Sequence, residues 1–317
     1  MRNFIAVDGG GTKTDIVRFT EDGHILCRHV GPGGNPYDLG QEEALRRLSV
    51  CIEAVLACCS EPVAGIYGGM AGEIAYGDFF SPYVKERHPR IGHARFDDDG
   101  CNLISGTLGH RDGCGMVCGT GSSLFVRVEG QPLRHIGGKG YLIDTGGSGY
   151  ELGQAAVKMA LRSVDGRIGP TVLTELLPEL LGMPVSDKII SVVHRGGRPF
   201  IASLARTVFA GRKLGDSVCQ EIFDTQSALL ADLTFAAKQY FPGDFDVVLG
   251  GGIAVHYPEY VEAIRSKAAP GARILLQQVP PIYGAAVEAL WDAGIAAGET
   301  IRKNFLEDYA CLTNTDS

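Results

Sequence analysis

The first thirty residues alternate between short, largely apolar runs and short polar segments. The apolar runs, at residues 5–7, 15–19 and 24–30, are separated by a glycine-rich segment and by an acidic turn that ends in glycine. Apolar runs of this length, bounded by turn residues, are typical of paired β-strands. The pattern therefore predicts a three-stranded meander whose first connection is the polar tip of "AVDGGGTKTDIV".

The same layout returns at residue 116. The segment "MVCGTGSSLFVRVEGQPLRHIGG" again combines a short apolar strand, a tip of Gly, Thr and Ser, a second strand, an acidic turn with glycine and a third strand. A pattern that occurs twice at this length indicates an internal duplication.

Helices and strands alternate after each meander. After the first, apolar residues recur at helical spacing from Leu45 to Leu56. The expected elements there are helices at 38–59, 79–89 and 102–109 and strands at 62–69 and 91–96. After the second meander they are helices at 150–164, 171–182, 187–196, 216–241, 258–268 and 284–295 and strands at 245–252 and 272–279. The alternation predicts an α/β fold in which mixed sheets are covered by helices, twice over.

Composition narrows the class of protein. A chain of 317 residues with 45% hydrophobic and 21% charged residues suits two globular domains of ordinary size. The formal net charge of −8 and the scattered Lys and Arg argue against a nucleic-acid partner, which needs clustered cations. No apolar run approaches the ~20 residues of a membrane span, so we expect no membrane partner.

Cysteine and histidine give no sign of a structural metal. The nine cysteines are irregularly spaced without a Cys-x-x-Cys pair, and the eight histidines form no His-x-x-x-His pair. We expect the cysteines to be reduced, small apolar residues of a cytoplasmic protein.

Both polar tips are candidate phosphate sites. Glycines have no Cβ, so their backbone N–H groups can approach a phosphate oxygen, and nearby hydroxyls add donors. The first tip offers Gly9, Gly10, Gly11 and Thr12, and the second offers Gly119, Thr120, Gly121 and Ser122. Neither a Walker loop nor a dinucleotide fingerprint fits the first tip. A glycine-rich turn without a ligand is the alternative for each.

Three adjacent acids, Asp97, Asp98 and Asp99, are candidate general bases. A carboxylate in such a place can accept the proton of a substrate hydroxyl. The acids lie between a predicted strand and a predicted helix, where α/β sheets gather active-site residues. A solvated acidic turn is the alternative.

The motifs and their order resemble those of the acetate and sugar kinase, heat-shock chaperone and actin superfamily. Within it, the chain resembles the N-acetylglucosamine kinase family and its relatives, the activator ATPases of 2-hydroxyacyl-CoA dehydratases. The matching segments are "DGGGTKT", "GPGGNPYDLG", "DDDGCNLISGTLG", "CGTGSS", "GGKGYLIDTGGSGYELG", "VVLGGGIA" and "PPIYGAAVEA". The resemblance implies two duplicated domains of the actin-like, ribonuclease H-like ATPase fold, with five-stranded mixed sheets and an active site in the interdomain cleft. We expect one domain at residues 1–115 with about 286–310, and the other at 116–285.

The resemblance also implies roles for individual residues. Asp99 would be the general base, with Asp98 as the fallback, and Asp8 would hold Mg²⁺. The nucleotide-binding residues would be Gly9, Gly10, Gly11, Thr12, Lys13, Gly119, Thr120, Gly121, Ser122, Gly250, Gly251 and Gly252. The substrate-binding residues would be Asn35, Asp98, Gly137, Gly138, Asp144 and Thr145.

The chain departs from the family where the family reads its sugar. The family's Gly-Asp-Glu-Gly-Ser is "DTGGS" here, so Thr145 and Gly146 replace the two acids and Asp144 stands one place earlier. Ala71 replaces a serine of the family that lies near the sugar. The phosphate and catalytic segments therefore match better than the segments that select the sugar.

Three functions follow from the resemblance. The first is an ATP- and Mg²⁺-dependent kinase that phosphorylates the 6-hydroxyl of an amino sugar, such as N-acetylglucosamine, glucosamine or N-acetylmuramic acid. The second is an activator ATPase that drives a partner dehydratase, although Cys118 lacks the following Ala-Ala of that signature. The third is a sugar sensor without turnover. We expect a homodimer, the commonest assembly of soluble enzymes.

Overall fold

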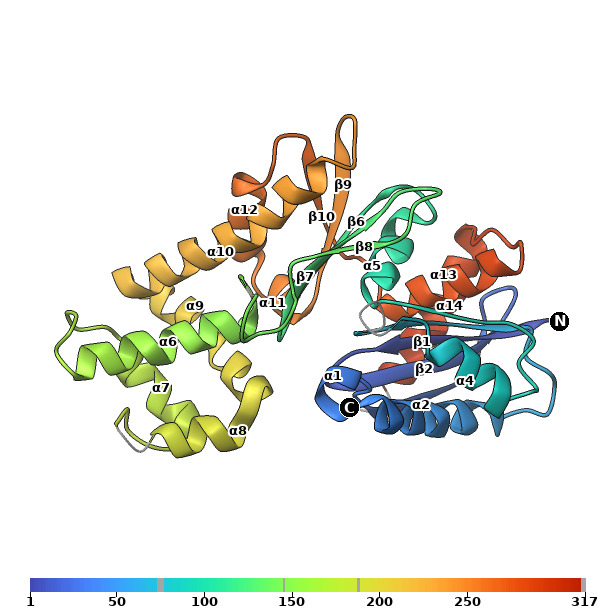
Figure 1. The fold of residues 1–317 in the computed structure, drawn as a ribbon, viewed down its shortest axis with the longest axis horizontal. Helices are drawn as coiled ribbons and strands as arrows, with labels where there is room; N and C mark the ends of the chain where they lie inside the picture. Colours follow the sequence, from blue (N-terminus) through green and yellow to red (C-terminus); the bar gives the residue numbers. More distant parts are fainter. Residues whose placement is uncertain (73–76, 145, 187–188, 315–317) are drawn as a thin grey trace. The chain divides into compact units, whose positions relative to one another are not determined.

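The computed structural model describes residues 1–72, 77–144, 146–186 and 189–314. The chain divides into two compact units, one of Met1–Arg111 with Gln277–Ser317 and one of Asp112–Leu276 (Figure 1). Each unit contains one five-stranded sheet with helices. The predicted α/β class with two mixed sheets is confirmed.

The sheet of the first unit has the order β3-β2-β1-β4-β5. Its strands are β1 (Asn3–Gly9), β2 (Lys13–Thr20), β3 (Ile25–Pro32), β4 (Gly65–Met70) and β5 (Ala94–Asp97). The first three pair antiparallel, as the predicted meander requires, and β4 and β5 continue the sheet in parallel with β1.

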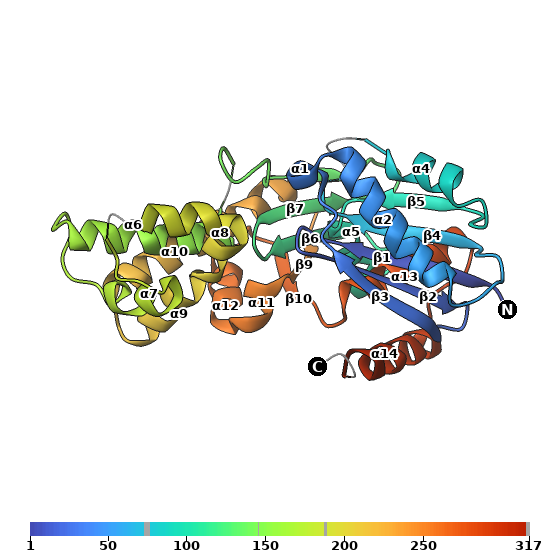
Figure 2. The ribbon, with the colours of Figure 1, turned by 90° about the horizontal axis from the view of Figure 1, so that it is seen from below.

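Helices cover both faces of this sheet. They are α2 (Gln41–Leu56), α4 (Phe80–Arg87), α5 (Gly100–Leu108), α13 (Pro281–Asp292) and α14 (Glu299–Asn314). Because strand side chains alternate between faces, Ile5 and Val7 pack in one core with α2 and α4, whereas Phe4 lies opposite with Phe19 and Phe305 of α14. Figure 2 shows α2 in front of the strands and α14 along the lower edge of this unit.

The sheet of the second unit repeats the first. Its order is β10-β9-β6-β7-β8, with an antiparallel meander of β6, β7 and β8 and parallel pairing of β6 with β9 and of β9 with β10. The strands are β6 (Gly113–Cys118), β7 (Ser122–Arg127), β8 (Arg134–Ile136), β9 (Phe245–Gly250) and β10 (Ala272–Leu276). Since each strand has a counterpart in the first unit in both position and direction, the predicted duplication is confirmed.

The second unit has a larger set of helices. They are α6 (Gly149–Val164), α7 (Leu173–Leu181), α8 (Ile189–Ser203), α9 (Ala205–Lys213), α10 (Ser217–Lys238), α11 (Gly252–His256) and α12 (Pro258–Lys267). Phe209, Phe223 and Tyr260 of α9, α10 and α12 meet edge to face, which joins these helices in one core. The sequence pattern did not indicate α9, α11, α14 or the short α1 (Pro36–Leu39).

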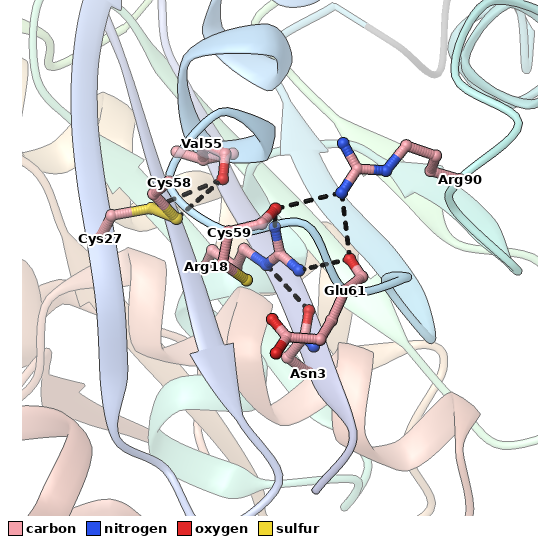
Figure 3. The surroundings of a disulfide bond; sticks show 8 residues. All are labelled: Asn3, Arg18, Cys27, Val55, Cys58, Cys59, Glu61 and Arg90. Carbon is pink, nitrogen blue, oxygen red and sulfur yellow. Dashed lines mark hydrogen bonds between the residues drawn. A yellow bond between two sulfur atoms is a disulfide. The ribbon is translucent and has the colours of Figure 1, made fainter.

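One prediction about cysteine was wrong. Cys27 of β3 and Cys58, just after α2, form a disulfide, so these two are not reduced thiols (Figure 3). They are 31 residues apart in sequence, and only the packing of α2 on β3 brings them together. The same corner holds the buried Arg18, whose guanidinium donates to the carbonyl oxygens of Cys59 and Glu61.

No helix in the described part of the chain is both long and apolar enough to cross a membrane.

Candidate active site

The first polar tip is a tight connection supported from behind by a glycine pair. Gly10 N–H donates to the Lys13 carbonyl (2.9 Å), and Gly33 N–H and Gly34 N–H donate to the carbonyls of Thr12 (3.1 Å) and Gly10 (3.2 Å). A Cβ on Gly33 would lie 2.1 Å from the carbonyl oxygen of Gly11, so only glycine fits there. Gly33 and Gly34 therefore support the backbone of the tip, while Thr12 and Lys13 are exposed.

Asn35 follows the supporting glycines directly. Its Oδ1 accepts a hydrogen bond from Tyr37 N–H (2.9 Å) and caps the short helix α1. A Cβ on Gly72 would lie 3.1 Å from this oxygen. Asn35, predicted to bind the sugar, thus lies beside the first tip, and its side-chain oxygen already accepts a hydrogen bond from the backbone of α1.

Asp8 lies on the face of the sheet that also carries Gly69 and Asp97. The three residues are in register across β1, β4 and β5. Asn102 of α5 donates from Nδ2 to Asp8 Oδ1 (2.8 Å) and to the Val7 carbonyl (3.4 Å). A Cβ on Gly69 would lie 2.4 to 2.5 Å from all three terminal atoms of the Asn102 amide. Gly69 therefore provides the space from which Asn102 reaches Asp8.

The carboxyl of Asp8 is held in an unfavourable setting for a negative charge. Burial raises its pKa from 3.8 to about 7; the hydrogen bond from Asn102 and the charge of Lys13 oppose the rise, and the charges of Asp99 and Asp15 add to it. A cation bound here would remove this penalty. Asp8 therefore fits a site that a divalent ion completes.

The three adjacent acids have different surroundings. Asp97 pairs with Arg95 (2.5 Å), whose guanidinium also binds Glu288 and Asp292 of α13. Asp98 is buried, with 2% of its surface exposed. The next acid is only partly buried.

That third acid, Asp99, lies at the start of α5, as the sequence predicted. Its carbonyl accepts from Asn102 N–H (3.1 Å). Burial raises the pKa of Asp99, and hydrogen bonds with the Asp98 side chain and Gly100 N–H oppose the rise. Asp99 is close enough to Asp8 to raise the pKa of that carboxyl. The structure therefore brings both acids to one edge of the first sheet.

Asp15, the cross-strand neighbour of Asp8, has the opposite setting. Arg28 binds both its carboxylate oxygens at 2.9 Å, and Tyr309 of α14 donates its hydroxyl at 2.7 Å. Asp15 is thus a buried acid held by a cation, whereas no ion pair among the described residues holds Asp8.

The second tip rests on the start of α6. Gly119 N–H donates to the Gly121 carbonyl (2.9 Å), while Gly149 N–H and Tyr150 N–H donate to the carbonyls of Gly119 (2.8 Å) and Thr120 (3.2 Å). Ser148 begins the helix in a capping box with the Glu151 side chain, and its hydroxyl also contacts the Thr120 carbonyl (3.1 Å). The tip and the helix are therefore one rigid piece.

The glycine run after β9 adjoins this tip. Gly251 has a φ of 102°, and a Cβ there would lie 2.5 Å from the Cys118 carbonyl oxygen. A Cβ on Gly119 would lie 3.9 Å from Gly252 N. Two of the predicted nucleotide segments, the second tip and residues 250–252, thus lie side by side.

The predicted sugar loop packs against the start of β7. Gly138 has a φ of 66°, and a Cβ there would lie 2.6 Å from the Ser122 carbonyl oxygen. The Ser122 hydroxyl donates to the Gly146 carbonyl (2.6 Å), and Asp144 Oδ2 accepts from Lys139 N–H (3.1 Å). The other paired glycine, residue 137, has a φ of 65° and lies against α10. Thr145 lies outside the described residues.

Sequence reasoning missed two supporting groups. Asn102 is three residues after Asp99, about one helical turn further along α5. That spacing could have indicated that Asn102 lies on the same side of the helix as Asp99. The pair Ser148 and Glu151 has the spacing of a capping box, a signal that was present in "SGYE".

The donor set of the first tip suits Mg²⁺. Magnesium uses one or two carboxylates, waters and substrate phosphates rather than a cage of protein ligands. In the described residues, no group of three or more His, Cys, Asp or Glu forms a metal cage. Asp8, beside the exposed tip, is a carboxylate of the required kind.

Comparison with known proteins gives a family and relatives of similar length. The family described as the BadF/BadG/BcrA/BcrD ATPase family matches residues 5–289. An N-acetyl-D-glucosamine kinase of Dictyostelium discoideum is 29% identical over 317 residues, covering 90% of this chain and 97% of that protein. An N-acetylmuramic acid/N-acetylglucosamine kinase of Clostridium acetobutylicum is 30% identical over 231 residues, covering 70% of this chain and 74% of that protein.

A solved structure has the same fold. A candidate N-acetylglucosamine kinase of Chromobacterium violaceum matches with a TM-score of 0.69 and 24% identity, covering 92% of this chain and 99% of that one.

Proposed function

The chain belongs to the BadF/BadG/BcrA/BcrD ATPase family, and from this premise we propose that it is an ATP-dependent kinase whose acceptor is an amino sugar. The match confirms the resemblance that the motifs indicated. Both curated relatives are sugar kinases that act on N-acetylglucosamine, and one also acts on N-acetylmuramic acid.

One observation carries the proposal: two carboxyls whose pKa burial raises, Asp8 and Asp99, lie at one sheet edge beside a rigid glycine tip. Phosphoryl transfer to a hydroxyl needs charge neutralisation at the phosphates and a base at the acceptor. The geometry offers Asp8 for the first task and Asp99 for the second. Asp97 is unsuited to either task, because its carboxylate is already paired with the Arg95 guanidinium.

Each residue has a defined part in this proposal. Asp99 accepts the proton of the sugar hydroxyl, which we propose is the 6-hydroxyl, and burial, which raises the pKa of Asp99, makes it a stronger base than an ordinary aspartate. Asp8, oriented by Asn102, holds Mg²⁺, which neutralises charge on the phosphates.

The remaining site residues bind rather than react. The two glycine tips and residues 250–252 bind the nucleotide, with Lys13 adding a positive charge. Asn35 and the loop around Gly138 and Asp144 orient the sugar.

The test is ADP release with ATP and Mg²⁺ against N-acetylglucosamine, glucosamine, N-acetylmuramic acid, N-acetylmannosamine and glucose. Asp99→Asn should lower kcat by about 10²- to 10⁴-fold while sugar binding is retained, because a positioned base contributes that much. Asp97→Asn is the matched control on a neighbouring carboxyl and should leave kcat within a few-fold of the wild type. Asp98→Asn tests the fallback base.

The outcomes separate the candidate functions. Loss of kcat in Asp98→Asn but not in Asp99→Asn would move the base to Asp98. Hydrolysis of ATP that no sugar stimulates would refute the kinase and favour an activator ATPase, and sugar binding without ADP release would favour a sensor. A 6-deoxy analogue of the best sugar should bind and not be phosphorylated.

Assembly and domain limits belong to the same proposal. We expect a homodimer, which light scattering would show. We also expect the boundaries between the two functional domains near residues 115 and 285, and limited proteolysis would locate them.

A further inference from the structure

Arg198 lies at a break in helix α8. Gly197, inside that helix, has a φ of 62° and a ψ of −165°, which no α-helix contains, and Pro199 follows. A residue that precedes proline is disfavoured in the helical conformation. The chain therefore leaves its helical course at the point where it carries a long cationic side chain.

The guanidinium of Arg198 lies against the second glycine tip. A Cβ built on Gly121 would be 2.2 Å from Arg198 Nη2 and 3.5 Å from its Cζ. Gly121 has no positive φ, so its backbone does not demand glycine. The absence of a side chain at position 121 instead gives the guanidinium access to the tip.

This cation has no acidic partner in the part of the chain that the structure describes. Arg198 Nε is buried without a hydrogen-bond partner, and among the described residues no carboxylate forms an ion pair with Arg198. The face of the Tyr141 ring, 5.3 Å from Cζ, is the aromatic contact that supports it. A guanidinium stays charged in proteins, and a buried N–H without an acceptor is costly, so an anionic acceptor would satisfy both the charge and the free N–H.

The second tip contains no cation of its own. The first tip carries Lys13, whereas "CGTGSS" contains no Lys or Arg. The tip offers backbone N–H groups and hydroxyls, which orient phosphate oxygens but do not neutralise them. A planar guanidinium matches two oxygens of one phosphate group.

We propose that Arg198 binds the phosphate chain of the nucleotide at the second tip and neutralises charge there during transfer. Resting on the proposed function for its reaction, this inference adds a phosphate-binding residue from outside the glycine motifs. The absence of a side chain at Gly121 leaves room for the guanidinium, and its Cζ lies over the Tyr141 ring.

The test compares nucleotides that differ only in their phosphates. Binding of ADP and of AMP is measured by calorimetry without sugar, for the wild type, Arg198→Met, Arg198→Lys and Gly121→Ala. Arg198→Met should weaken ADP binding about 10- to 100-fold and AMP binding less than about threefold, since charged hydrogen bonds to the outer phosphate are lost. Arg198→Lys should recover part of the loss, and Gly121→Ala, whose Cβ displaces the guanidinium, should reproduce part of it.

Arg195→Met is the matched control. Arg195 is on the same helix before the break, is exposed, and donates from Nε to the Ser191 carbonyl (3.0 Å). Its replacement should leave ADP binding and turnover unchanged. Thermal unfolding of each variant shows whether the change is confined to the nucleotide.

Each outcome decides a separate question. Wild-type ADP affinity in Arg198→Met overturns the inference and leaves the kinase proposal standing. Equal loss of ADP and AMP binding with a lower Tm also overturns it, because Arg198 would then only support the fold. If the wild type phosphorylates no sugar but the ADP loss is specific to Arg198, the kinase proposal and the role in transfer fail, and the assignment of Arg198 to the phosphate chain holds.

Discussion

Asp8→Asn should stabilise the metal-free protein while removing its activity. Asp8 is the carboxyl whose pKa burial raises from 3.8 to about 7. In the unfolded chain the same group ionises near its ordinary pKa. Since the folded state resists ionisation, the favourable contribution of neutral Asp8 is present below pH 3.8 and is lost as pH rises towards 7. Asparagine does not titrate, and its carbonyl oxygen can still accept the hydrogen bond from Asn102.

The size of the effect follows from the shift. About three pKa units correspond to about 4 kcal/mol at pH 8, and the part of the shift already expressed at pH 5 corresponds to about 2 kcal/mol. At about 2–4 °C per kcal/mol, the Asp8→Asn variant should unfold about 8–16 °C above the wild type at pH 8. The gap should narrow steadily towards pH 4.

Thermal unfolding from pH 4 to 8, with a chelator and without nucleotide, measures this gap. Asp15→Asn is the matched control, because Asp15 faces Asp8 across the two strands and is paired with Arg28 and Tyr309. Neutralising Asp15 removes the carboxylate charge that both guanidinium hydrogen bonds of Arg28 address, so this variant should be destabilised by about 3–5 kcal/mol. An Asp8→Asn variant that unfolds with the wild type at every pH would refute the reasoning, as would a gap that does not depend on pH.

Three further predictions concern other parts of the molecule. Burial lowers the pKa of His135, which stacks on Phe125, to about 4. The stability that neutral His135 contributes should therefore be lost as pH falls from 6.5 to 4, by at most about 3 kcal/mol. In thermal unfolding, the Tm of His135→Phe should fall less steeply than that of the wild type over this pH range. Cys27→Ser should lower stability by about 4 kcal/mol, the value expected for a closed loop of this length, and non-reducing peptide mapping of the wild type should find Cys27 linked to Cys58. Gly251→Ala, at a φ of 102° with a carbonyl oxygen 2.5 Å from the new Cβ, should cost at least about 1–3 kcal/mol in thermal unfolding and weaken ADP binding in calorimetry.

Local patterns predicted the fold well because the signals were local. The apolar runs and turns of 5–30 and 116–138 specify two meanders, and their repetition along the chain is enough to indicate the duplication. The disulfide could not be predicted in this way. Cys27 and Cys58 meet through the packing of α2 on β3, and nothing in the spacing of 31 residues records that contact.

The candidate site was predictable to the extent that it follows motifs. The residue pattern placed Asp97 to Asp99 at a strand end but could not separate them, and only the family resemblance selected Asp99, with Asp98 as the fallback. In the structure the three acids differ in their partners and in their burial. Asp97 forms an ion pair with Arg95, and Asp98 is more deeply buried than Asp99. Arg198 was beyond sequence reasoning, because its position depends on a helix break 77 residues after Gly121 in the chain.

The two duplicated meanders have the same backbone topology but carry different side chains at corresponding positions. Asp8 is the next-to-last residue of β1, and the corresponding place in β6 is Val117. The partner opposite Asp8 is Asp15, and the partner opposite Val117 is Ser123. A buried carboxyl without a cation costs stability, so a second copy of Asp8 would add that cost. The second unit instead has glycines and hydroxyls at its tip, which under the proposed function would bind phosphates, and the metal site proposed at Asp8 would have no counterpart there.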